Sequence, residues 1–102
     1  MENEEVVFTI ILHAGSARSF CFEALALARE NKFTEAAERI TEAKKELNEA
    51  HRMQTTLLQT EAGGEKYEVN LLLIHAQDHL MTAILAKDLI QEMISMLQEK
   101  NL

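Results

Sequence analysis

The residues best suited to chemistry lie in one segment, residues 75–82, whose sequence is His-Ala-Gln-Asp-His-Leu-Met-Thr. Positions i, i+3, i+4 and i+7 share one face of a helix, because each residue turns the chain by about 100°. That face forms a polar stripe in an otherwise aliphatic segment, with Gln77 beside it, and consists of His75, Asp78, His79 and Thr82. Burying polar groups costs free energy unless they find partners, so the stripe needs a reason.

Residue types alone leave three interpretations of the polar stripe open. A histidine in an apolar helix is most often a hydrogen-bonded core or interface residue. His75 and His79 also have the i, i+4 spacing of helical metal ligands, and Asp78 could complete a minimal site. The His-Glu-x-x-His pattern is absent, however, and no cysteine lies near.

The third interpretation is a histidine that accepts a phosphoryl group. An imidazole nitrogen near neutral pH is a good nucleophile, and its phosphoryl adduct has a high transfer potential. His75 would be the acceptor, and Gln77, His79 and Thr82 could donate hydrogen bonds to phosphoryl oxygens. Asp78 would repel phosphate unless its side chain points elsewhere or is neutralised by a proton or a cation.

Composition predicts one soluble, nearly all-helical domain over residues 1–102. The chain has no proline, only three glycines and a formal net charge of −7. This acidity argues against a nucleic-acid partner, because little basic charge is available to neutralise phosphates. The single cysteine, Cys21, cannot form an intramolecular disulfide, which favours a reducing compartment. The acidic first residues do not resemble a signal peptide, and we expect a cytoplasmic protein without membrane insertion.

The elements that must position the stripe are three long helices, predicted at about residues 4–30, 34–59 and 67–100. Thr34 is expected to cap the second helix, because its hydroxyl can accept a hydrogen bond from an unpaired backbone amide. Residues 60–66 form the one convincing loop, since the adjacent Gly63 and Gly64 disfavour helix on entropic grounds.

The apolar patterns of the three helices differ. The second helix has a clean apolar stripe surrounded by charged residues, typical of a helix that is packed on one side and wet on the other: Ala36, Ile40, Ala43, Leu47, Ala50 and Leu57. The first and third helices are apolar nearly all the way round, which a three-helix monomer cannot cover. We therefore expect a homo-oligomer in which these two helices face inward and the second faces water.

Other candidate residues are weaker. His13 lies beside Ala14 and Gly15, a segment where helices can approach closely, and could line the cleft from an adjacent subunit, with simple packing as the alternative. His51 is expected to be structural or at the surface, and Cys21 a small buried apolar residue. The methionines at helical spacings are interpreted as core or adaptable contact surface rather than a cofactor site: Met53, Met81, Met93 and Met96.

Residues 75–82 resemble the active-site helix of the enzyme IIA components of the lactose/cellobiose class (which includes diacetylchitobiose systems) of bacterial sugar phosphotransferase systems. The likeness extends over most of the chain. Segments 15–19, 47–55 and 62–66 are similar to parts of that family's first helix, second helix and interhelical loop. The eight-residue match is highly specific, whereas the other segments would be weak alone.

The resemblance implies a spectrin-repeat-like antiparallel bundle of three helices that assembles as a homotrimer of nine helices. It implies that His75 accepts a phosphoryl group on Nε2 from the phosphocarrier HPr and passes it to a cysteine of the cognate IIB protein, with Gln77 as a supporting hydrogen-bond partner. Three copies of Asp78 would share a metal ion, most simply Mg²⁺, on the threefold axis. Three buried carboxylates need such a cation, because each raises the pKa of the others.

The implied pathway is uptake of a β-linked disaccharide such as cellobiose, lactose or diacetylchitobiose. The competing hypothesis is a non-catalytic helical oligomer or adaptor stabilised by metal. In that case the polar stripe would be an interface network.

Overall fold

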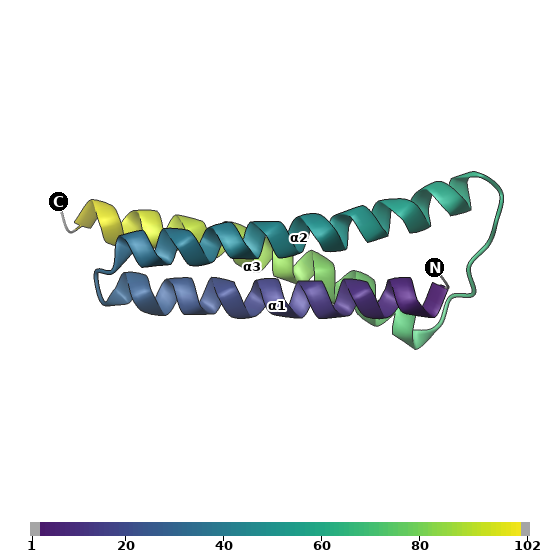
Figure 1. Cartoon of the computed structure of the whole chain (residues 1–102), viewed down its shortest axis with the longest axis horizontal. Helices are drawn as coiled ribbons and strands as arrows, with labels where there is room; N and C mark the ends of the chain where they lie inside the picture. The colour runs from purple at the N-terminus through teal and green to yellow at the C-terminus, as the bar shows by residue number, and fades with distance from the viewer. Residues whose placement is uncertain (1–2, 101–102) are drawn as a thin grey trace.

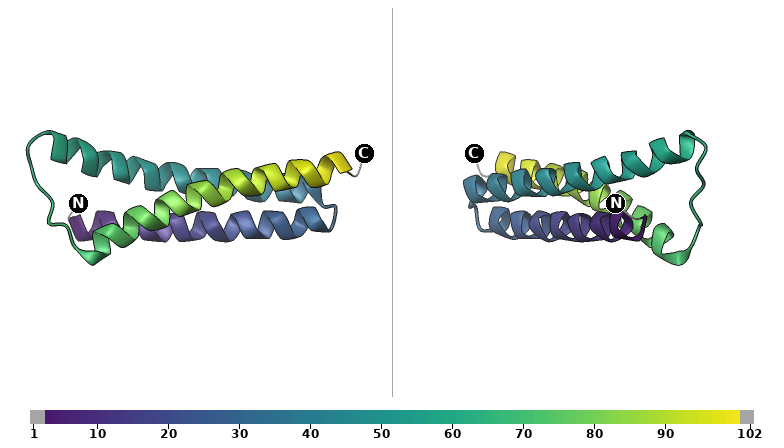
Figure 2. Two further views of the ribbon diagram at one scale, coloured as in Figure 1. Left: turned by 180° about the vertical axis from the view of Figure 1, so that it is seen from behind. Right: turned by 45° about the vertical axis from the view of Figure 1, so that its right-hand side comes forward.

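The structure, a computed structural model, describes residues 3–100, which form three α-helices in an antiparallel bundle (Figure 1). Helix α1 spans Asn3–Arg29, α2 spans Phe33–Ala62 and α3 spans Leu71–Lys100. The molecule is a rod with principal extents of 54 × 20 × 18 Å. Seen from behind, α3 crosses obliquely from the N-terminal end of α1 toward the N-terminal end of α2 (Figure 2). The predicted all-α, three-helix antiparallel bundle is confirmed.

A tight turn joins α1 to α2. Asn31 has a positive φ of 63°, and its N–H donates to the Ala28 carbonyl at 3.0 Å while that of Lys32 donates to the Leu27 carbonyl at 2.9 Å. This bonding pattern closes the α1 C-terminus. The predicted Thr34 cap is wrong. Helix α2 already begins at Phe33, and Lys32 occupies the N-cap position without a side-chain capping bond. The preceding turn already sets the direction in which the chain enters α2.

The second connection lies later in the chain than predicted. Helix α2 continues to Ala62, and Gly64 then adopts a φ of 105°, which glycine tolerates. Helix α3 begins at Leu71 rather than near residue 67, because Asn70 supplies the capping group. The Asn70 Oδ1 accepts a hydrogen bond of 2.9 Å from the Leu73 N–H.

The core is built largely from alanines, which let the helices approach closely. The buried residues of α2 are the six predicted from its apolar stripe. Helix α3 buries Ala76, Leu80, Ala83 and Ile90 on the opposing side. The largest fully buried side chains are Ile10, Leu80 and Cys21. The expectation that Cys21 is a small buried residue is confirmed.

Helices α1 and α3 leave many large apolar side chains exposed, as their all-round patterns predict. The exposed set on α3 is Leu71, Ile74, Met81, Leu85, Leu89, Met93 and Met96, and on α1 it is Phe8, Leu12 and Phe22. Helix α2 exposes Leu58. Residues 4–29 form the one helix, among the described residues, that is long and apolar enough to cross a membrane, a test that core helices of soluble proteins also pass.

Candidate functional site

Two histidines of the polar stripe lie together on α3. The His75 and His79 rings stack with centroids 5.6 Å apart and an angle of 7° between their planes. His75 is exposed, whereas His79 is half-buried against α1. The outer ring is therefore open to an incoming reactant, and the inner ring supports it from behind.

The environment of His79 favours its neutral form. Partial burial lowers the pKa of the imidazole, and the nearby His75 and Arg18 lower it further, while Asp78 acts in the opposite direction. A neutral imidazole carries one N–H donor and one acceptor nitrogen.

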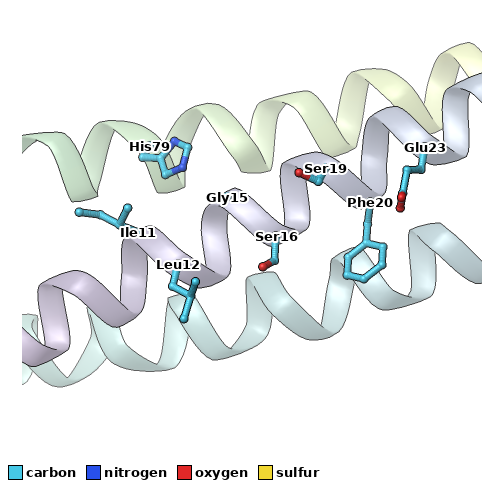
Figure 3. A pocket seen from close by; sticks show the side chains of 8 residues that line it. All are labelled: Ile11, Leu12, Gly15, Ser16, Ser19, Phe20, Glu23 and His79. Atoms are coloured by element: carbon cyan, nitrogen blue, oxygen red, sulfur yellow. The ribbon is translucent and has the colours of Figure 1, made fainter.

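His79 forms one wall of an open groove along α1, with a volume of about 630 Å³ (Figure 3). The α1 wall combines small and polar residues with apolar ones: Ile11, Leu12, Gly15, Ser16, Ser19, Phe20 and Glu23. Gly15 faces the His79 ring across the edge of this groove. A Cβ atom added at residue 15 would be 3.4 Å from His79 Nε2.

Gln77 points to the other side of α3. Its Oε1 accepts a hydrogen bond from Nε2 of Gln54 on α2, in a half-buried pair. The prediction that Gln77 lies beside the stripe agrees with this geometry. Sequence reasoning did not identify Gln54 as its partner, because the two residues are 23 positions apart and nothing local couples them.

Asp78 is exposed and lines a different groove from His79. This second groove has a volume of about 440 Å³, and its other lining residues are Leu73, Ile74, Gln77 and Met81. Among residues 3–100 no group of three or more histidine, cysteine or acidic side chains could hold a metal ion. Within one chain the His75, Asp78 and His79 side chains therefore do not form the minimal zinc site considered from sequence.

The remaining candidates are placed away from the stacked rings. The Thr82 hydroxyl donates to the His79 carbonyl at 3.1 Å, so its proton is already used. Within one chain, His13 points toward α2 and pairs through Nδ1 with Glu46. His51 is exposed and lines a smaller groove with Lys44 and Lys87.

Comparison with known proteins identifies the class. Residues 5–98 match the family model for the PTS system lactose/cellobiose-specific IIA subunit. The chain is 47% identical over 98 residues to the lichenan-specific phosphotransferase enzyme IIA component of Bacillus subtilis, covering 96% of this chain and 89% of that protein.

Solved structures agree with the fold. The cellobiose-specific enzyme IIA of Bacillus anthracis superposes with a TM-score of 0.95 at 49% identity, covering 99% of this chain and 94% of that one. The IIA(chitobiose) chain of an Escherichia coli IIA–HPr complex gives a TM-score of 0.87 at 41% identity, covering 100% and 99%. The chain therefore belongs to the lactose/cellobiose-specific IIA subunits of the sugar phosphotransferase system, which are phosphotransfer proteins.

Proposed function

We propose that His75 is the phosphoryl carrier of this IIA subunit. Its Nε2 attacks the phosphorus of phosphorylated HPr, and the bond from phosphorus to HPr breaks as the new N–P bond forms. A cysteine thiolate of the cognate IIB protein then attacks the same phosphorus and releases His75. The observation that carries the proposal is the exposed His75 ring, stacked on the half-buried His79 ring.

The stacked geometry suits this chemistry because phosphoryl transfer depends mainly on positioning. His75 must be accessible to two different proteins in turn, and its exposure allows that. The solved IIA–HPr complex of a relative that is 41% identical supports HPr as the donor. The acidic net charge of −7 suits a donor with a basic rim.

The sugar served is proposed to be a β-linked disaccharide or oligosaccharide. Relatives are named for lichenan and for N,N'-diacetylchitobiose. The sugar would meet the membrane partner rather than this subunit, so we place the protein in the cytoplasm, between HPr and IIB.

Gln77 is proposed to support the site through α2. Its Oε1 holds the Gln54 amide, which fixes the orientation of the Gln77 side chain. The Gln77 Nε2 makes no hydrogen bond within residues 3–100 and stays available to donate.

We further propose a homotrimer in which three α3 helices meet at the exposed apolar surface that contains Asp78. Ile74 and Met81 flank Asp78 in the same groove and are more than half exposed in the single chain. Burying these side chains on a threefold axis would bring three carboxylates together. Carboxylate oxygens are ligands for hard cations, so Asp78 from each subunit would hold a shared ion, most simply Mg²⁺.

One labelling experiment tests the carrier role. The protein is incubated with phosphoenolpyruvate, enzyme I and HPr, and intact mass is measured before and after acid treatment. The wild type should gain one acid-labile phosphoryl group, and adding IIB should discharge it. His75→Ala should stay unlabelled, while the control His51→Ala, at an exposed histidine of α2, should label like the wild type. Labelled His75→Ala, or an unlabelled wild type, would leave the non-catalytic oligomer as the better description.

A second experiment tests the metal site. Metal content per trimer is measured by mass spectrometry for the wild type, for Asp78→Asn and for the control Asp88→Asn. Asp88 is an exposed carboxylate of α3 that pairs with Lys87 at 2.7 Å. Only Asp78→Asn should lose the bound ion, and only in that variant should the stability of the trimer no longer depend on chelators. Unchanged metal content in that variant would refute the shared site.

A further inference from the structure

Gly15 stands in the middle of α1, where glycine is a poor choice for the helix. Glycine destabilises a helix interior relative to alanine, because it loses more backbone freedom on folding. No positive φ requires it, since Gly64 is the one glycine with that conformation among the described residues. The reason for Gly15 must therefore lie in what surrounds it.

The neighbour of Gly15 is the inner ring of the histidine pair. His79 Nε2 would be the nearest atom to a Cβ at this position, at 3.4 Å, and it is the one atom within 4 Å outside the local backbone. Figure 3 shows the His79 ring reaching from α3 toward the α1 backbone at Gly15, at the edge of the groove. The absence of a Cβ at Gly15 thus leaves space beside the His79 ring, on the side that faces α1.

This space matters because the His79 ring is stacked on the His75 ring, with 7° between their planes. A phosphoryl group arriving on His75 adds bulk and charge beside His79. The His79 ring can shift toward α1 only if the side that faces Gly15 stays open. A Cβ at contact distance would close it.

We propose that Gly15 is a positioning residue for phosphoryl transfer, acting through His79. The inference rests on the proposed role of His75 in phosphoryl transfer. It adds that α1 contributes to this site because residue 15 has no side chain. Gly15 touches neither HPr nor the phosphoryl group in this scheme. Its substitution should therefore slow the transfer step without weakening partner binding.

The test compares Gly15→Ala and Gly15→Leu with the control Gly63→Ala. The control also places a Cβ 3.4 Å from its nearest neighbour, the Thr60 carbonyl oxygen, but at the far end of α2. Single-turnover transfer from phosphorylated HPr is measured over a range of HPr concentrations. We expect Gly15→Ala to lower the maximal rate about tenfold, and Gly15→Leu more, with half-saturation unchanged, since small misplacements carry large rate costs.

Stability and assembly separate positioning from packing. Gly15→Ala should be at least as resistant to urea as the wild type, because alanine is the better helix former, and its sedimentation mass should be unchanged. A slower rate accompanied by an altered assembly mass would assign Gly15 to packing between subunits and overturn the proposal.

A double-mutant cycle provides the decisive control. If Gly15 acts through His79, Gly15→Ala should have no further effect on the rate in a His79→Ala background. An equal slowing in both backgrounds, or a Gly15→Ala rate equal to the wild type, would refute the inference while leaving the carrier role of His75 intact. An unlabelled wild type would instead refute the carrier role itself.

Discussion

Helices α2 and α3 have the same length, 30 residues each, yet they divide their surfaces in opposite ways. Helix α2 buries one apolar stripe within the chain and leaves charged residues outside. Helix α3 buries a similar inner stripe but also exposes an apolar face, to which Ile74, Met81 and Leu85 belong. The polar stripe with His75 and His79 lies between these two faces of α3.

This difference shows how one helix can present three separate surfaces. Its inner face packs within the subunit, its outer apolar face is exposed in the single chain, and the polar stripe lies between them. A helix like α2 has no such spare surface. Separate faces also allow Asp78 and His79, which are adjacent in sequence, to line different grooves.

The largest expected effect separates the inner and outer faces of α3. Leu80 is fully buried, whereas Leu85 is 57% exposed. Leu80→Ala should lower the free energy of unfolding by about 2–5 kcal/mol, because it removes buried methyl groups and leaves a cavity. Urea unfolding at one fixed protein concentration, with Leu85→Ala as the control, measures the difference. If Leu80→Ala and Leu85→Ala lost equal free energy of unfolding at a concentration where the chain is monomeric, the division of α3 into a buried inner face and an exposed outer face would be contradicted.

The next prediction compares the outer faces of α3 and α2 directly. Leu85 and Leu58 have nearly equal exposure, 57% and 54%. If α3 forms the trimer contact, Leu85→Gln should weaken association, since each buried leucine contributes about 1.5–3 kcal/mol. Leu58→Gln should leave it unchanged. Sedimentation velocity across a dilution series gives the mass of each variant, and parallel behaviour of the two would argue against an α3 interface.

Much of this division could be read from the sequence, because helix periodicity is local. The six buried residues of α2 follow from their spacing, and the all-round apolar character of α1 and α3 correctly predicts their exposed side chains. The grouping of His75 with His79 follows from the same i, i+4 geometry.

Features that depend on how helices cross could not be predicted in this way. The Gln54–Gln77 hydrogen bond and the placement of Gly15 opposite His79 bring together residues that are far apart in the chain. The helix starts were missed for a more local reason. Helix α3 starts after its cap, Asn70, and not near residue 67 as predicted. The turn at Asn31 makes a cap at Thr34 unnecessary.

The starts of the two helices offer a smaller comparison. Asn70 caps α3 through its side chain, whereas Lys32 at the start of α2 makes no such bond. Asn70→Ala should therefore cost about 0.5–2 kcal/mol of stability, within the usual range for a lost N-cap. Lys32→Ala should cost less than that. Urea midpoints of both variants test the prediction, and a larger loss at Lys32 would show that the α1–α2 turn matters more than the cap.

The smallest expected effect compares a lysine of α3 with a lysine of α2. The question is which of the two charges influences the buried Cys21 thiol. Burial raises the pKa of the Cys21 thiol on α1, and the charge of Lys87 on α3 partly opposes that shift. A raised thiol pKa contributes stability that is present below the ordinary thiol pKa of about 8.5 and lost as the pH rises through the folded value. Stability should therefore fall slightly at alkaline pH, and Cys21→Ser should reduce this dependence.

Lys87→Met should raise the Cys21 pKa further and slow its alkylation at pH 8, because less thiolate forms. Lys44→Met, which removes an exposed lysine from α2, should leave the alkylation rate unchanged. The rate is measured by intact mass after timed exposure to iodoacetamide. Equal slowing by both substitutions would mean that the net charge of the protein, rather than the position of Lys87 on α3, sets the reactivity of the buried thiol.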